Sequence, residues 1–154
     1  MAAARGTFRL AHEDDTTRLG AALAGALKVG EAICLEGPLG AGKSVLARGL
    51  VRQLTTDDEE VPSPTFTLVQ VYHGDPIGVA HFDLYRLSGP EEVYELGLDD
   101  ALEDGAAIIE WPERLGRHRP PDWLDIEITL DADEQTRHAR LTPHGAWEDR
   151  SIDF

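Results

Sequence analysis

Residues 37–44 read Gly37-Pro38-Leu39-Gly40-Ala41-Gly42-Lys43-Ser44, and they match the pattern G-x-x-x-x-G-K-[ST] at every defined position. Glycines allow backbone N–H groups to turn inward around phosphates, and a helix that starts after them adds positive potential. In such a loop Lys43 reaches the β- and γ-phosphates, and the hydroxyl of Ser44 ligates magnesium. The pattern therefore predicts a site for a nucleoside triphosphate and Mg²⁺, formed by Gly37, Leu39, Gly40, Ala41, Gly42, Lys43, Ser44 and Val45.

The segments on either side of this loop have the order that the pattern requires. Glu31 to Glu36 is a compact apolar stretch, which predicts a buried strand leading into the loop. After the loop, apolar residues recur at helical spacing up to Leu54. An earlier helix is expected to begin at Asp14 or Asp15, run through Leu27 and end at Gly30. Strand, loop and helix thus follow one another as in the phosphate-binding motif.

The remaining sequence predicts strands alternating with helices, then a hairpin. A short edge strand is expected at 7–11, strands at 67–73 and 79–85 around a turn at 74–76, a helix from Pro90 to about Asp104 interrupted at Gly97, a buried strand at 106–110, and a hairpin of 123–130 with 136–142. We therefore predict an α/β fold for residues 1–154, with its core at about 7–143. It is one P-loop NTPase-like domain, a mixed sheet flanked by helices with a C-terminal β-hairpin.

The composition excludes several classes of protein. The net charge is −15, from 29 acidic and 14 basic residues, so direct binding of DNA or RNA is not expected. No stretch has the roughly 18 apolar residues of a membrane span, and the N-terminus lacks the apolar centre of a signal peptide. A cytoplasmic protein is expected. The single cysteine, Cys34, lies in an apolar run and predicts a buried core residue.

Several other residues are candidates for the same site, each with a plainer alternative. Glu110 and Asp83 follow apolar stretches and either could face the metal, or could be a solvated carboxylate at a strand end. Thr65, in Ser63-Pro64-Thr65, could present a hydroxyl to the γ-phosphate or simply enter a strand. Trp111 could be a core or interface aromatic or could stack on a base, and Thr16 or Thr17 is a candidate for the adenine pocket.

Five blocks of this sequence, in order, resemble the TsaE family of P-loop ATPases, which act in the synthesis of threonylcarbamoyladenosine in tRNA. The blocks are Leu39-Gly40-Ala41-Gly42-Lys43-Ser44, Ser63-Pro64-Thr65-Phe66-Thr67-Leu68-Val69, His81-Phe82-Asp83-Leu84-Tyr85-Arg86-Leu87, Glu95-Leu96-Gly97-Leu98-Asp99 and Ile109-Glu110-Trp111-Pro112-Glu113-Arg114. Three positions depart from the family pattern: Pro38, Ser44 and Val45 stand where Asp, Thr and Thr are common. Serine keeps the metal-binding oxygen, whereas Pro38 has no N–H to donate to a phosphate.

The resemblance implies a role for each candidate. Glu110 would ligate Mg²⁺ together with Ser44, Thr65 would belong to a switch-like loop, and Asp83 would organise the metal or the attacking water. Lys43 would bind the phosphates of ATP, and Trp111 and Thr17 would lie beside the nucleotide. The resemblance further implies slow ATP hydrolysis with TsaB-like and TsaD-like partners, and contact with tRNA only through them. The tRNAs would be those that read codons beginning with A.

Two other functions remain open from the sequence. The alternative is a small-molecule kinase using the same loop, which would need an acceptor pocket and usually an arginine-rich lid, whereas the arginines here are scattered apart from Arg114, Arg117 and Arg119. A nucleotide-binding regulatory protein without useful hydrolysis is the third possibility. No arginine is placed by the sequence as an arginine finger, so weak hydrolysis by the isolated chain is expected.

Overall fold

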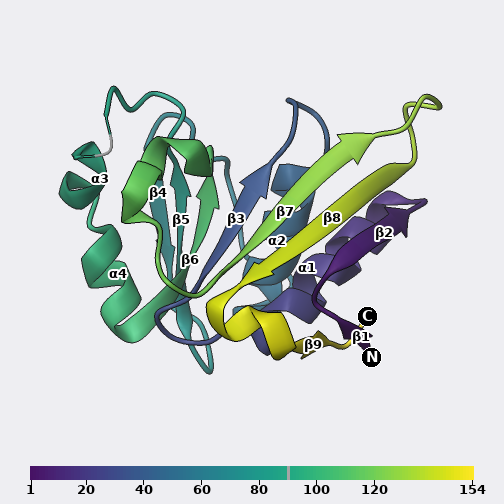
Figure 1. The fold of residues 1–154 in the computed structure, drawn as a ribbon, viewed down its shortest axis with the longest axis horizontal. Coiled ribbons are helices and arrows are strands. Elements are labelled where there is room, and N and C mark those ends of the chain that lie inside the picture. Colours follow the sequence, from purple (N-terminus) through teal and green to yellow (C-terminus); the bar gives the residue numbers. More distant parts are fainter. Residues whose placement is uncertain (90) are drawn as a thin grey trace.

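A mixed seven-stranded sheet forms the centre of the molecule in the computed structural model, which describes residues 1–89 and 91–154 (Figure 1). The strand order is β2-β8-β7-β3-β6-β5-β4. β3 pairs in parallel with both β6 and β7, and β5 pairs in parallel with β6, whereas β4, β8 and β2 are antiparallel to their neighbours. The predicted α/β fold with a mixed sheet is therefore confirmed.

The elements are β1 (Ala2–Ala3), β2 (Gly6–Leu10), α1 (Glu13–Ala26), β3 (Ala32–Glu36), α2 (Lys43–Leu54), β4 (Val69–Tyr72), β5 (Gly78–Asp83), α3 (Glu92–Glu95), α4 (Leu98–Asp104), β6 (Gly105–Glu110), η1 (Pro112–His118), β7 (Trp123–Leu130), β8 (Arg137–His144), η2 (Gly145–Asp149) and β9 (Ser151–Ile152).

Side chains from the central strands enter two cores, one on each face of the sheet. In β6, Ala106 and Ile108 belong to one core, and Ala107 and Ile109 belong to the other, as the two-residue period of a strand requires. The first core is covered by α1 and α2, which lie behind β3, β7 and β8 in Figure 1. The second is covered by α3, α4 and η1. Because both faces are packed, these strands read as continuous apolar runs in the sequence.

The helices α1 and α2 approach so closely that glycine is required at their contact. A Cβ atom on Gly20 would lie 2.2 Å from the carbonyl oxygen of Leu46, and one on Gly49 would lie 2.4 Å from that of Thr17. Both obstacles are backbone atoms, which cannot rotate away. The position of α2, which begins with Lys43, is thus fixed by direct backbone contact with α1.

Most of the predicted elements are present with their ends shifted by a few residues, and α1 begins at Glu13, before the Asp14 or Asp15 that was expected to cap it. The strand expected from residue 67 begins at Val69, because residues 64–67 form a turn in which Leu68 N–H donates to the carbonyl oxygen of Pro64 at 2.7 Å. The strand expected to reach residue 85 ends at Asp83. The uneven helix is two short helices, α3 and α4, and the interruption expected at Gly97 is confirmed, with φ 85° at this residue. Its predicted start at Pro90 lies outside the described residues.

The C-terminal tail, for which the sequence predicted nothing, completes the first core. Trp147 in η2 is fully buried, and β9 pairs with β1, so the two termini lie side by side (Figure 1). Arg150 donates to both carboxylate oxygens of Glu31 and lies 4.4 Å from the centre of the Trp147 ring. Buried side chains therefore extend from Ala4 to Ile152, beyond the span of 7–143 expected for the core.

None of the helices in the described ranges has the length and apolarity needed to cross a bilayer.

Candidate functional site

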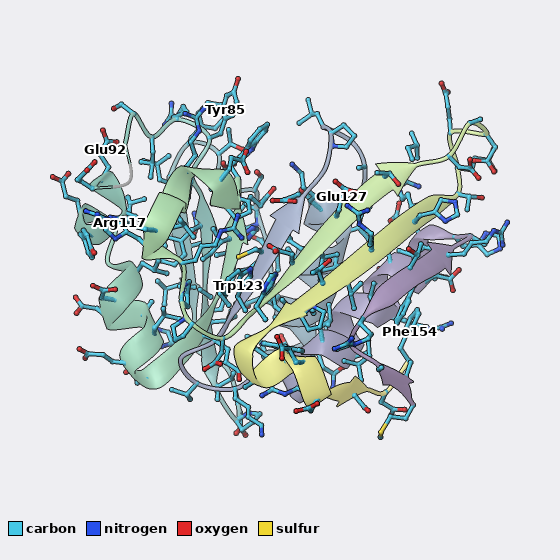
Figure 2. All side chains as sticks on the ribbon, in the orientation of Figure 1. Tyr85, Glu92, Arg117, Trp123, Glu127 and Phe154 are labelled. Carbon is cyan, nitrogen blue, oxygen red and sulfur yellow. The ribbon has the colours of Figure 1, made fainter. Side chains whose placement is uncertain are left out.

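A pocket of about 220 Å³ opens at one edge of the sheet, where β5 and β6 end and α2 begins. The strands β3, β5 and β6 are mutually parallel, so their carboxyl ends meet at this edge, the usual place for a ligand site in an α/β sheet. Tyr85, just after β5, marks the edge in Figure 2. The pocket is lined by Leu39, Gly40, Gly42, Lys43, Ser44, Val45, Ser63, Thr65, Asp83, Glu110, Trp111 and Arg137.

The glycine-rich loop adopts a backbone that side chains disfavour. Gly37, Gly40 and Gly42 have φ values of 142°, 81° and 114°, in the left-handed half of conformational space. A Cβ on Gly37 would also lie 2.3 Å from the carbonyl oxygen of Ile128, so this glycine lets the loop rest directly against β7. The carbonyl oxygen of Pro38 accepts from Ala41 N–H at 3.1 Å. Pro38 thus supports the turn of the loop through its carbonyl oxygen, although it has no N–H to offer a phosphate.

Lys43 lies against Trp111 rather than in solvent. Its Nζ is 5.0 Å from the centre of the Trp111 ring, a cation–π contact, and only 8% of the lysine is exposed. Trp111 has φ 59°, which is uncommon for a bulky residue and costs on the order of 1–3 kcal/mol. This conformation turns the chain away from β6 and brings the ring to the pocket, where it also contacts Tyr85 at 4.8 Å between ring centres. Trp111 therefore lines the pocket and also packs, partly buried, against the second core.

Thr65 and Asp83 are joined by a hydrogen bond across 18 residues of sequence. Thr65 Oγ1 donates to Asp83 Oδ2 at 3.3 Å, and Ser63 Oγ lies 2.7 Å from the same threonine hydroxyl. The other carboxylate oxygen of Asp83 accepts from the backbone N–H of Tyr85 at 3.0 Å. These contacts anchor the loop that carries Ser63 and Thr65 to the end of β5. The structure places Thr65 and Asp83 side by side at the pocket, and their roles remain predictions.

Glu110 ends β6 next to Asp83, its partner in the register of β5 and β6. Glu110 is 6% exposed, and its Oε2 lies 2.7 Å from Nε2 of His81, which is 2% exposed. His81 was not among the residues predicted for the site. Its signal was available in the two-residue spacing from Asp83, which places both side chains on the same face of β5.

Arg137 lines the pocket, although no sequence pattern indicated it. Arg137 is the first residue of β8, and its Nε donates to the carbonyl oxygen of Ala41 at 2.9 Å. One of its terminal nitrogens lies 3.5 Å from the carbonyl oxygen of Gly40. It therefore holds the loop from outside and brings a positive charge to the pocket. No local pattern marks this contact, because it depends on how the C-terminal hairpin packs against a loop 96 residues earlier.

Three predicted ligand-binding residues lie away from this pocket. Gly37 instead lines an adjoining cavity of about 210 Å³ with Leu35, Glu36, Lys43, Trp111 and Glu113. Burial, reinforced by the charge of Asp125, raises the pKa of Glu36 there. Ala41 is fully buried. Thr17 donates to the carbonyl oxygen of Glu13 at 3.3 Å, and its neighbour Thr16 is the residue packed near Gly42. Thr17 as an adenine contact remains a prediction.

The oxygens at the pocket suit magnesium. Ser44 offers a hydroxyl, and Asp83 and Glu110 offer carboxylates, which are the hard ligands that this ion prefers. Within residues 1–89 and 91–154, no group of three or more His, Cys, Asp or Glu side chains is placed to hold a metal alone. Magnesium commonly binds through one or two carboxylates together with water and substrate phosphates, so the residues present fit an ion that arrives with a nucleotide.

Comparison with known proteins identifies the family. The family described as threonylcarbamoyl adenosine biosynthesis protein TsaE matches residues 10–139. The chain belongs to the TsaE family. The matched TsaE segment contains the whole glycine-rich loop, Thr65, Asp83, Glu110 and Arg137, whereas η2 and β9 lie beyond it.

Individual TsaE relatives are similar over most of their length. The chain is 34% identical to a protein of Rickettsia felis over 94% of this chain and 84% of the relative, and 40% identical to one of Nostoc over 87% and 83%. Both are named tRNA threonylcarbamoyladenosine biosynthesis protein TsaE. The crystal structure of YdiB from Bacillus subtilis has a TM-score of 0.73 and 26% identity, and the match covers 90% of this chain and 85% of YdiB. The TsaE chain therefore shares its α/β architecture with a solved structure.

Proposed function

We propose that this chain binds ATP and hydrolyses it slowly, as an accessory subunit in the formation of threonylcarbamoyladenosine in tRNAs that read codons beginning with A. It would act with TsaB-like and TsaD-like proteins. The observation that carries the proposal is the pocket that joins Lys43 and Ser44 to Thr65, Asp83 and Glu110, in a chain of the TsaE family. The name shared by the relatives supplies the link to tRNA modification.

Each pocket residue has a task in the proposed reaction. Lys43 leaves the face of Trp111 to bind the β- and γ-phosphates, and the backbone N–H groups of the loop bind the same oxygens. Ser44 and Glu110 would hold Mg²⁺, which would neutralise charge on the phosphates. Asp83, kept in place by Tyr85 N–H, orients the attacking water, and Thr65 exchanges its bond to Asp83 for one toward the γ-phosphate.

Two exposed apolar side chains beside the pocket support a protein partner at this edge. Leu39 at the tip of the loop is 99% exposed, and Phe66, next to Thr65, is 84% exposed. A partner that covers them would order the loops on both sides of the nucleotide. The net charge of −15 favours contact of tRNA with the partners rather than with this chain.

A small-molecule kinase is the second candidate, and one observation favours it. The cavity lined by Glu36 and Glu113 adjoins the nucleotide pocket at Lys43 and Trp111, where an acceptor molecule would have to lie. Phosphorylation of a metabolite by the isolated chain with ATP would support the kinase and contradict the accessory role.

The deciding experiment is reconstitution of tRNA modification over many turnovers with purified TsaB-like and TsaD-like proteins. ATP hydrolysis should rise when the partners are added, and Lys43→Ala should abolish both hydrolysis and repeated modification. Lys28→Ala is the matched control, because Lys28 is exposed and is the only other lysine. Hydrolysis that the partners leave unchanged would refute the accessory role, and ATP binding without any hydrolysis would favour a regulatory protein.

A further inference from the structure

The buried pair His81–Glu110 contains the proposed metal ligand and a residue with no assigned role. His81 is the only side chain in the described residues with a hydrogen bond to Glu110, at 2.7 Å between Nε2 and Oε2. In the register of β5 and β6, His81 lies opposite Ile108 and Asp83 lies opposite Glu110. His81 lies two residues before Asp83 on β5 and therefore reaches Glu110 from the core side of the pocket.

The chemistry of the pair fixes the position of a proton. A carboxylate that ligates a metal is ionised and can only accept hydrogen bonds, so the hydrogen of a neutral His81 must sit on Nε2. Nδ1 is then an acceptor, and it is buried without a hydrogen-bond partner among the described residues. An apolar side chain would fill this position in the core without leaving a buried polar atom unpaired. The contact with Glu110 is what a histidine here provides.

The two carboxylates at this edge are held by different means. Asp83 is held by Tyr85 N–H and Thr65, which belong to the loops at the mouth of the pocket. Glu110 is held from beneath by His81, through one oxygen only, Oε2. The other oxygen, Oε1, has no side-chain partner in the described part of the chain and belongs to a residue that lines the pocket.

We propose that His81 is a positioning residue, which donates from Nε2 to Oε2 of Glu110 and so directs the remaining oxygen toward the magnesium of a bound nucleotide. This inference rests on the proposed function, because it assumes that Glu110 ligates the metal. Hydrogen-bond partners of metal ligands typically change metal affinity by about 10–100-fold when they are removed. His81 should therefore control how tightly magnesium binds and leave the phosphate contacts of Lys43 unaffected.

The test compares His81→Leu, which removes the donor, with His81→Gln, whose amide nitrogen can occupy the place of Nε2. The readout is the Mg²⁺ concentration that half-saturates the change in tryptophan fluorescence with ADP bound, alongside ADP affinity without Mg²⁺. His81→Leu should raise this Mg²⁺ concentration about 10–100-fold at unchanged Mg²⁺-free ADP affinity, and His81→Gln should restore most of the loss. A change confined to the Mg²⁺-free affinity would contradict a positioning role.

Two further measurements separate failure of this inference from failure of the proposed function. If Glu110→Ala weakens Mg²⁺ binding while a folded His81→Leu variant behaves as wild type, the positioning role is overturned and the metal site stands. If Glu110→Ala has no effect, the metal site itself is overturned, and the inference with it. Imidazole ¹⁵N spectra of the wild-type protein test the geometry without any variant. The Nε2–H tautomer of His81 is expected, and an Nδ1–H tautomer would exclude the donor role.

Discussion

Replacing Gly20 by alanine tests whether the position of the nucleotide loop depends on the contact between α1 and α2. The added methyl group would lie 2.2 Å from the carbonyl oxygen of Leu46 and 2.9 Å from the backbone nitrogen of Leu50. An ordinary contact begins at 3.4 Å, so the helices must separate by about 1 Å locally. The obstacle is backbone, so no change of rotamer relieves it. The whole of α2, including Lys43 at its first turn, has to move.

The expected magnitude combines two opposing terms. Overpacking a tight contact costs about 1–3 kcal/mol, and here the larger values apply because the clash is with backbone. Replacing a helical glycine by alanine in itself raises the free energy of unfolding by about 0.5–1 kcal/mol. The net loss in the free energy of unfolding should be about 2 kcal/mol, or about 4–8 °C in Tm for a domain of this size. A displacement of about 1 Å at Lys43 and Ser44 would also reduce ATP turnover by up to about 100-fold.

Chemical denaturation followed by circular dichroism, together with ATP turnover in the presence of the partners, measures both effects. The matched control is Gly25→Ala in the same helix, because a Cβ at Gly25 would meet no heavy atom within 4 Å. This variant should be more stable than wild type by about 0.5–1 kcal/mol, with unchanged turnover. If Gly20→Ala matches Gly25→Ala in stability, the two helices do not touch through their backbones and the reasoning is wrong.

Three further outcomes are expected. Burial raises the pKa of the Cys34 thiol, so at pH 8 it should react with a thiol reagent only after unfolding; rapid reaction of the native protein would contradict its place in the core. Trp147→Ala should lower the free energy of unfolding, measured in urea, by about 3–5 kcal/mol. Trp147→Phe should lower it by less, because Nε1 of Trp147 has no hydrogen-bond partner in the described residues that would be lost. Equal losses for the two variants would contradict this expectation. Arg137→Ala should weaken ATP binding about tenfold by calorimetry, whereas Arg140→Ala, exposed on the same strand, should not; an equal effect of both would show that only net charge matters.

The parts of the site that depend on local chemistry could be predicted from the sequence. The loop at 37–44 requires its residues one after another, so the pattern alone placed Lys43 and Ser44. Asp83 and Glu110 followed from apolar stretches that end in a carboxylate, although the pattern could not choose between a metal ligand and a solvated acid. The resemblance to the TsaE family made that choice, and the structure places both side chains at one pocket.

The parts that depend on distant contacts could not be predicted. Arg137 holds the loop only because the hairpin of β7 and β8 packs beside it, and the same residue in isolation reads as an exposed strand arginine. Trp147 and Arg150 lie in a tail with no periodic pattern, and their burial results from the packing of η2 against the first core. Leu68 N–H bonds to Pro64 in a turn, which shortens β4 relative to its apolar pattern.

The pairing of β1 with β9 has a consequence for the order in which this chain can fold. β2 pairs with β8 and β1 with β9, so residues 2–10 find their strand partners among residues 137–152. Such long-range pairing slows folding, because the intervening chain loses conformational entropy before the stabilising contacts form. Arg137 belongs to the same late segment, so a nascent chain carries the complete loop sequence well before that loop is held in place. The proposed phosphate binding is therefore expected only once the hairpin of β7 and β8 has been synthesised and has packed beside the loop.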